Sequence, residues 1–203
     1  MPEMLAATIK SRPIYEGLRL DGRAKRHLVA AEGEGALAVL DMLAGEDAAL
    51  ARATLLYAPG GSAGQEHGAK LAALRPDGFH PLPTQPTLLN RLEVILQTAT
   101  MGTRIYVAGT EGFIGKVVAL AQAHGVDPQS VRTEHRGSLA RRVQCVHCKG
   151  MTENVTASPF VCSHCGLNLF VRDHYSRRLG AFQGVCVDAE VPGEIPPAEE
   201  LFR

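Results

Sequence analysis

Short apolar runs alternate with helix-like patterns through the first two thirds of the chain. The apolar runs predict strands at residues 27–31, 54–58, 79–82, 104–108 and 131–134. Between them apolar residues recur at helical spacing, which predicts helices at residues 37–43 with 48–53, 65–74, 88–99 and 111–125. Strands and helices that alternate in this way predict an α/β fold with a doubly wound, parallel, five-stranded sheet.

The loop after the first predicted strand has the spacing of a dinucleotide-binding loop. Its sequence, GEGALA at residues 33–38, fits G-x-G-x-x-A and makes the sheet Rossmann-like. However, Glu32 and Glu34 stand where a pyrophosphate would lie, and a helix N-terminus offers only about half a positive charge to offset them. We therefore expect the shape of a nucleotide site whose ligand binding has been lost.

The last third of the chain carries all five cysteines. Four of them follow the pattern C-x2-C-x13-C-x2-C and are the predicted metal ligands: Cys145, Cys148, Cys162 and Cys165. Two tight turns of this kind can place four sulfurs in a tetrahedron. We expect Gly150 and Gly166 to provide the backbone freedom of the turns. His147 and His164 should bond elsewhere or face solvent, and Cys186 is a spare thiol.

The identity of the metal stays open between two elements. Zinc would make the segment a small four-cysteine zinc ribbon with a closed structural site. Iron in a rubredoxin-like site would make it an electron carrier, because four thiolates also suit iron.

Charge is unevenly distributed although the formal net charge is zero. Residues 132–182 carry 8 Lys and Arg against 3 Asp and Glu, whereas residues 183–203 carry 1 against 5. The basic residues around the cysteines are Arg136, Arg141, Arg142, Lys149, Arg172, Arg177 and Arg178. They form either a docking face for an acidic partner or nucleic acid, or a solvated surface balanced by the acidic end of the chain. Nucleic acid is disfavoured, because only Tyr175 and Phe182 could stack on bases.

The sequence contains no apolar run of the length that a membrane span needs, and its first residues do not resemble a signal peptide. We therefore expect a cytoplasmic protein without a membrane partner. Its expected segments are an N-terminal arm (1–26), the α/β domain (27–137), the ribbon (138–185) and an acidic, Pro-rich tail (186–203).

Residues 27–137 resemble the nucleotide-binding half of ferredoxin-reductase-type flavoenzymes. The resemblance lies in HLVAAEGEGALAVLDML, ATLLYAPGG and above all RIYVAGTEGFIGKVVALAQAHGVDPQSVRTEHRG. It implies these candidate nucleotide-binding residues: Gly33, Gly35, Gly109, Thr110 and Glu134. The chain departs from the family where Leu37 and Ala38 replace a hydroxyl residue and a proline. It departs again where Pro59 replaces an arginine, and where Ala108-Gly109-Thr110 replaces a Cys-Gly-Pro turn.

Residues 160–185, FVCSHCGLNLFVRDHYSRRLGAFQGV, resemble a family of small subunits of bacterial dimethylamine monooxygenases. These multi-subunit enzymes oxidatively N-demethylate dimethylamine with NAD(P)H and O2, with haem on one subunit and a flavin/iron–sulfur reductase on another. The resemblance implies an accessory, structural subunit whose ribbon binds these partners.

No catalytic set is found in the sequence. Neither G-x-S-x-G nor H-E-x-x-H occurs, and Glu134 with His135 at the end of the last strand is the only candidate pair. The alternative functions are an electron-transfer component with iron and a zinc-ribbon nucleic-acid-binding protein.

Overall fold

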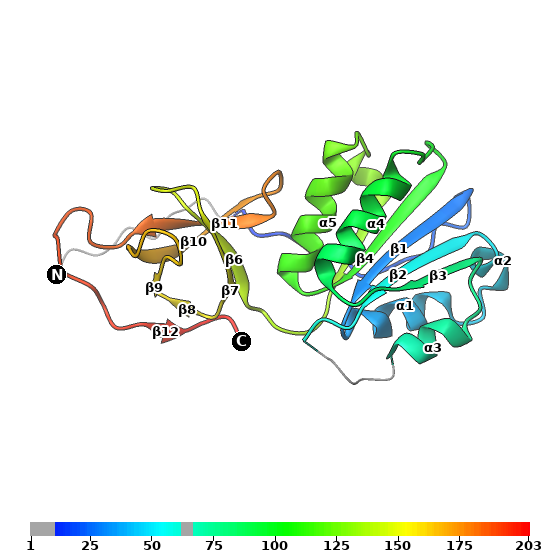
Figure 1. The fold of residues 1–203 in the computed structure, drawn as a ribbon, viewed down its shortest axis with the longest axis horizontal. Helices are drawn as coiled ribbons and strands as arrows, with labels where there is room; N and C mark the ends of the chain where they lie inside the picture. Colours follow the sequence, from blue (N-terminus) through cyan, green and yellow to red (C-terminus); the bar gives the residue numbers. More distant parts are fainter. Residues whose placement is uncertain (1–10, 62–66) are drawn as a thin grey trace. The chain divides into compact units, whose positions relative to one another are not determined.

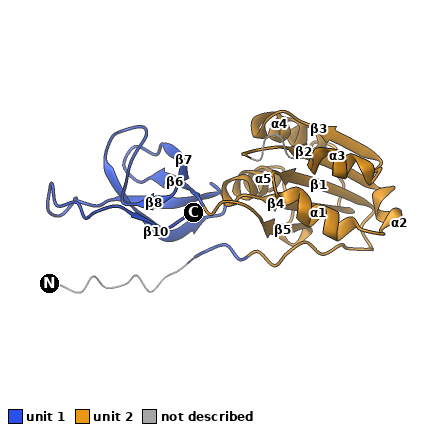
Figure 2. Ribbon diagram, turned by 90° about the horizontal axis from the view of Figure 1, so that it is seen from below, with its two compact units in different colours: residues 1–14, 140–203 blue, residues 15–139 orange. Residues whose placement is uncertain are grey.

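The computed structural model describes residues 11–61 and 67–203, which divide into two compact units (Figure 2). The sheet unit is Tyr15–Leu139, and the ribbon unit is Ala140–Arg203 together with residues 11–14. The expected arm at 1–26 is therefore shared: residues 15–26 group with the sheet and residues 11–14 with the ribbon.

Five parallel strands form the sheet of the sheet unit, in the order β3-β2-β1-β4-β5. They are β1 (Arg26–Glu32), β2 (Ala53–Ala58), β3 (Gly78–Pro81), β4 (Thr103–Gly109) and β5 (Val131–His135). The predicted five-stranded parallel sheet is confirmed, and every predicted strand end lies within one residue of the observed one. β1, β2 and β4 are almost entirely buried, as expected for parallel strands covered on both faces.

Helices cover both faces of this sheet. They are α1 (Gly35–Leu43), α2 (Asp47–Leu50), α3 (His67–Ala73), α4 (Gln85–Leu96) and α5 (Glu111–Ala123), with a 3-10 turn, η1 (Pro128–Ser130), before β5. Figure 1 shows α4 and α5 on one face and α1 and α3 on the other. Alternate residues of β1 enter the two cores: Leu28 and Ala30 pack on the α4/α5 side, and Val29 and Ala31 on the α1/α3 side.

Helix boundaries differ from the prediction by up to three residues. α4 begins three residues early because Thr84 and Thr87 form a capping box, in which each hydroxyl accepts a hydrogen bond from the other residue's backbone N–H. The helix predicted at 48–53 ends at Leu50, because Ala53 is already in β2. The helix predicted at 65–74 is observed as α3, and its residues 65 and 66 lie outside the described residues.

The segment before β1 is irregular in backbone but packed against the sheet. Leu18 and Leu20 contact the α1/α3-side core. The backbone N–H of Asp21 donates to the Tyr106 hydroxyl at 3.0 Å, and its carboxylate pairs with Arg104 at 2.9 Å. These contacts explain why residues 15–26 belong to the sheet unit.

The ribbon unit is a second, mainly antiparallel sheet in the order β7-β6-β11-β10-β9. Its strands are β6 (Arg141–Cys145), β7 (Met151–Val155), β9 (Phe160–Val161), β10 (Asn168–Ser176) and β11 (Ala181–Cys186). Only β11 and β6 pair in parallel. A separate two-stranded sheet joins β8 (Ala157–Ser158) to β12 (Glu199–Glu200).

The acidic end of the chain is folded back rather than extended throughout. Its β12 pairs with β8, and Phe202 is buried, with 8% of its surface exposed. The guanidinium of Arg141 lies 4.0 Å from the ring centres of both Phe182 and Phe202, and it donates to Asp173 at 3.0 Å. The predicted tail 186–203 is therefore wrong at its end, where a cation–π contact makes Phe202 part of the ribbon core.

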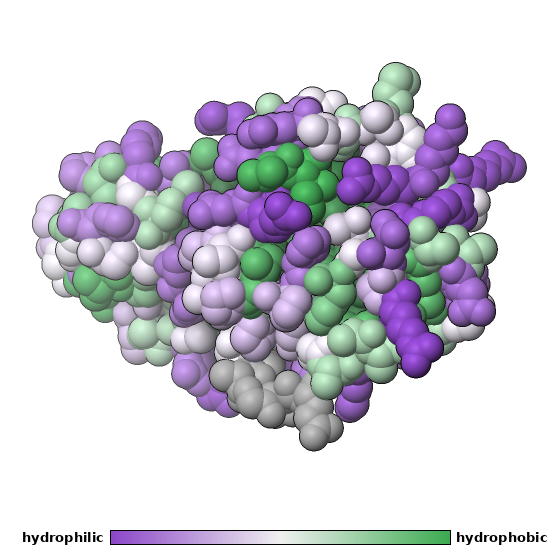
Figure 3. All heavy atoms as spheres, turned by 45° about the vertical axis from the view of Figure 1, so that its right-hand side comes forward, coloured by the Kyte–Doolittle hydropathy of each residue, from purple (hydrophilic) through white to green (hydrophobic). Residues whose placement is uncertain are grey.

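Among the described residues no helix is long and apolar enough to cross a membrane. On the face drawn in Figure 3, hydrophilic residues surround separate small apolar patches. This mixed surface agrees with a chain whose formal net charge is zero.

Candidate metal centre and candidate nucleotide crevice

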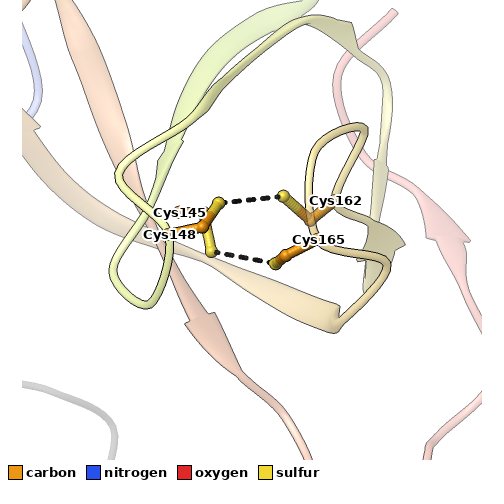
Figure 4. Close-up of side chains that lie close together, drawn as sticks. All are labelled: Cys145, Cys148, Cys162 and Cys165. Atoms are coloured by element: carbon orange, nitrogen blue, oxygen red, sulfur yellow. Dashed lines mark hydrogen bonds between the residues drawn. The ribbon is translucent and has the colours of Figure 1, made fainter.

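The four predicted ligands converge on one point of the ribbon unit (Figure 4). All four sulfurs lie within 4.8 Å of one another. The Sγ atoms of Cys145 and Cys165 are 3.9 Å apart, and those of Cys148 and Cys162 are 3.8 Å apart. A tetrahedron with metal–sulfur distances of about 2.3 Å has edges of about 3.8 Å. The donor set therefore fits a single four-coordinate metal ion.

The two C-x-x-C turns share one backbone design. In the first, the N–H of Lys149 donates to the carbonyl of Cys145 at 3.0 Å; in the second, the N–H of Gly166 donates to that of Cys162 at 3.1 Å. Lys149 and Gly166 both have a left-handed backbone, with φ of 63° and 75°. The second turn meets this need with glycine, whereas the first accepts the cost of a lysine.

Gly150 has another role than the predicted one. Its backbone is not left-handed, since Lys149 takes that conformation in the first turn. A Cβ added at Gly150 would lie 2.5 Å from the ring of His164, so this glycine allows the two turns to pack together. The ring of His164 in turn hydrogen-bonds to the Met151 carbonyl at 2.8 Å, and His147 is exposed. The prediction that neither histidine is needed as a ligand agrees with these positions.

The protonation of the thiols shows why the cluster favours a cation. Burial disfavours the thiolate of Cys162, but hydrogen bonds from the backbone of Cys165 and His164 lower its pKa to about 6. A backbone hydrogen bond from Leu167 favours the thiolate of Cys165, yet burial and the three neighbouring thiols raise its pKa to about 12. One sulfur ionises readily, whereas another keeps its proton in hydrogen bonds with the neighbouring sulfurs. A bound cation would remove that conflict.

Cys186 lies outside the cluster. It is half-buried and donates to the carboxylate of Asp188 at 3.2 Å. This hydrogen bond, with burial, raises the pKa of its thiol. The thiol is therefore held in its neutral form, which agrees with the predicted spare cysteine.

The glycine loop at the end of β1 has the predicted shape. Gly33 adopts a φ of 53°, and α1 begins at Gly35. A Cβ on Gly35 would lie 2.1 Å from the carbonyl oxygen of Ala108 in β4. The second glycine is thus required for helix–strand packing, whether or not a nucleotide binds.

The crevice beside this loop holds a carboxylate of the chain itself. Glu32 is buried, with 8% of its surface exposed, and both its oxygens accept hydrogen bonds. The side-chain amide of Gln85 donates to one oxygen at 2.8 Å, and the hydroxyl of Thr110 donates to the other at 2.7 Å. Lys116 extends the network, since its ammonium donates to Gln85 at 2.8 Å. Sequence patterns gave no signal for Gln85 or Lys116, which lie 53 and 84 positions after Glu32 in the chain.

Two glycines make room for this carboxylate. A Cβ at Gly60 would lie 2.8 Å from Cγ of Glu32, and one at Gly109 would lie 3.0 Å from its Cβ. Gly109 also has a φ of 154°. The side chain of Glu32 therefore fills the carboxyl end of β1, between the loops that follow β2 and β4.

The remaining candidate, Glu134, is also engaged by the chain. Its carboxylate accepts from the backbone N–H of Leu18 at 2.8 Å and from Arg136 at 2.7 Å. A pocket of about 520 Å³ lies beside it, lined by Tyr15, Glu16, Gly17, Glu111, Glu134, His135 and Leu139. Three carboxylates in this lining make it unsuitable for phosphate. The structure thus brings the predicted Glu134 and His135 together with the arm, which the sequence did not associate with any site.

Two family models match the chain. One is described as the N-terminal domain of dimethylamine monooxygenase subunit DmmA-like proteins and matches residues 7–131; the other is described as their C-terminal domain and matches residues 142–185. A curated relative, the heme-dependent oxidative N-demethylase delta subunit of Ectopseudomonas mendocina (strain ymp), is 36% identical over 115 residues. This match covers 55% of the chain and 65% of the relative, which is less than two thirds of the relative's length.

Solved structures similar to the chain include two reductases. Phthalate dioxygenase reductase is 17% identical with a TM-score of 0.48, and the match covers 67% of this chain and 46% of that one. The ferredoxin reductase in carbazole 1,9a-dioxygenase is 13% identical with a TM-score of 0.42, and the match covers 59% and 34%.

The packing role of Gly35 can be tested with a matched pair of variants. Gly35→Ala should lower the free energy of unfolding by at least about 2 kcal/mol, because its Cβ meets the backbone of β4. Gly22→Ala should change it by less than about 0.5 kcal/mol, because no atom outside the neighbouring residues lies within 4 Å of the new Cβ. Denaturant titrations measure both values, and a Gly35→Ala protein as stable as the parent would contradict the packing argument.

Proposed function

The chain belongs to the DmmA-like family of dimethylamine monooxygenase subunits, and on this premise we propose that it is an accessory subunit of an oxidative N-demethylase. The match of both family models, over residues 7–131 and 142–185, carries the proposal. The complex would N-demethylate dimethylamine with NAD(P)H and O2. Its haem and its flavin/iron–sulfur centres would reside on other subunits, which are the proposed partners of this chain.

The crevice of the sheet unit supports a structural rather than a nucleotide-binding role. A pyrophosphate at the start of α1 would lie beside the buried carboxylate of Glu32 and the exposed carboxylate of Glu34. Two unit charges about 4 Å apart interact by about 4 kcal/mol at an effective dielectric constant of about 20. That repulsion is larger than the contribution usual for an anion at a helix N-terminus, about 0.3–1 kcal/mol. The reductase-like sheet would thus serve as a scaffold.

The cysteine centre is proposed to hold zinc. Cys145, Cys148, Cys162 and Cys165 would supply four thiolates, a set that leaves no position open for a substrate. Zinc has no redox chemistry, so its contribution would be to fix the two turns of the ribbon. Iron in the same four sulfurs remains the alternative, and the exposure of Cys148 is the observation that favours it, since an electron carrier needs a ligand near the surface.

The subunit proposal is tested by co-expression. The chain should co-purify at a fixed ratio with the haem and reductase subunits of such an enzyme, as measured by size-exclusion chromatography. If the complex assembles and demethylates dimethylamine at the same rate without the chain, the chain has no accessory role. Failure of the chain to associate with any of these subunits would refute the proposal.

Metal analysis tests the cysteine centre. We expect about one zinc per chain and no visible absorption, whereas oxidised iron in four thiolates would be red. Cys148→Ser should lose the metal and unfold the ribbon unit, because structural zinc supplies folding free energy. Cys186→Ser is the matched control, since this thiol lies outside the cluster, and its metal content should stay unchanged.

Calorimetric titration tests the crevice. The parent protein should bind NADPH with a dissociation constant above about 1 mM, which corresponds to about −4.1 kcal/mol. Glu32→Gln removes one negative charge and should tighten any residual binding at least about tenfold, whereas Glu46→Gln at an exposed position should not. Micromolar binding by the parent protein would overturn the scaffold role.

A further inference from the structure

Among the described residues, the hydrophobic clusters of the ribbon sheet lie on one of its faces. Strand alternation places Leu169 and Val171 on its inner face, where they join two hydrophobic clusters. On the outer face Phe170 lies opposite Val185, and Val161 lies opposite Asn168. Phe170, Val161 and Val185 belong to none of the hydrophobic clusters of the described residues.

This outer face is apolar near the β9 edge of the sheet. Phe170 is 40% exposed and Val161 is 60% exposed. Val161 lies in the short edge strand β9, which pairs over two residues only with β10, the strand that carries Phe170. Arg172 is two residues after Phe170 in β10 and therefore points to the same side. We call Val161, Phe170, Arg172 and Val185 the hairpin face.

Further positive charge lies in the turn of the same hairpin. Arg177 and Arg178 lie in the exposed turn between β10 and β11. Within the described residues no ion pair is recorded for these two side chains or for Arg172. The hairpin therefore presents three guanidinium groups to solvent.

The one acidic residue in the hairpin is already paired within the chain. Asp173, the only acidic residue between Asn168 and Cys186, pairs with Arg12 and with the buried Arg141. Burial opposes ionisation of its carboxyl, but these two guanidinium groups hold its pKa below the usual range. Asp173 stays ionised in this internal network, and the three guanidinium groups lack a counter-charge within their own hairpin.

We propose that the hairpin face, together with Arg177 and Arg178 of the hairpin turn, is the docking surface for an acidic patch on another subunit of the complex. This inference rests on the proposed function and adds the location and chemistry of the contact. An exposed phenylalanine two residues before Arg172, with two more arginines in the hairpin turn, matches protein interfaces, in which aromatic residues and Arg are enriched while Lys is depleted. Single-stranded nucleic acid would instead require several stacking aromatics, and Phe170 is the only exposed one on this face of the described ribbon.

The test measures the affinity of the whole chain for the purified haem and reductase subunits. Arg177→Glu with Arg178→Glu should weaken the complex at least about tenfold, because charge reversal converts attraction into repulsion. Phe170→Ser should also weaken it, mainly by faster dissociation. Raising the salt concentration should reduce the affinity of the parent protein more than that of the double variant.

Matched controls keep the result interpretable. Arg19→Glu with Arg91→Glu reverses two exposed arginines of the sheet unit and should leave the affinity unchanged. Metal content and thermal midpoint should be the same in all variants, since every substituted side chain is exposed.

The outcomes separate this inference from the proposed function. If the parent protein binds a subunit and the hairpin variants bind it equally well, the docking surface is refuted and the accessory role stands. If the parent protein binds no subunit, the proposed function is refuted, and the docking surface with it. If the hairpin arginines are needed only for binding a DNA or RNA oligonucleotide, the acidic partner is refuted in favour of nucleic acid.

Discussion

The buried carboxylate of Glu32 is the constraint on which the sheet unit depends. A carboxylate with 8% exposure is stable only where donors satisfy both oxygens, and here they come from Gln85 at the start of α4 and Thr110 at the start of α5. One side chain at the end of β1 thereby ties together the two helices that cover one face of the sheet. The same contacts use the space and the donors that an anionic ligand would need. Stability of the scaffold and binding of phosphate are therefore in competition at this position.

A second buried charge organises the ribbon unit in the same manner. Arg141 is satisfied by Asp173 on one side and by the rings of Phe182 and Phe202 on two others. Because Phe202 is buried against Arg141, the segment around it is a structural part of the ribbon. The cysteine centre and this arginine stabilise opposite parts of the inner face, since Cys145 ends β6 and Arg141 begins it. A metal ion at the cysteines would not by itself provide a core at the Arg141 end of the sheet.

The sequence predicts those features that depend on local patterns. Strands buried on both faces read as apolar runs, so their ends were predicted within one residue, and the spacing of Cys145, Cys148, Cys162 and Cys165 was enough to predict their convergence. Features that depend on contacts between distant residues were missed. The packing of Leu18 on the sheet and of Phe202 on Arg141 leaves no periodic signal, and the left-handed conformation of Lys149 contradicts the preference for glycine. Gln85 was missed because nothing in a helix start indicates which buried acid it will face.

The structure of the sheet unit also explains why a resemblance to reductases need not imply reductase activity. In the sheet unit the glycines that define a nucleotide loop are required by packing: Gly35 by the backbone of β4, and Gly60 and Gly109 by the side chain of Glu32. A glycine pattern of this kind would persist even where no ligand binds, because its removal would cost stability. In the ribbon unit, by contrast, Arg172, Arg177 and Arg178 have no ion pair among the described residues. Charged side chains without an ion-pair partner in their own chain are available for contact with another protein.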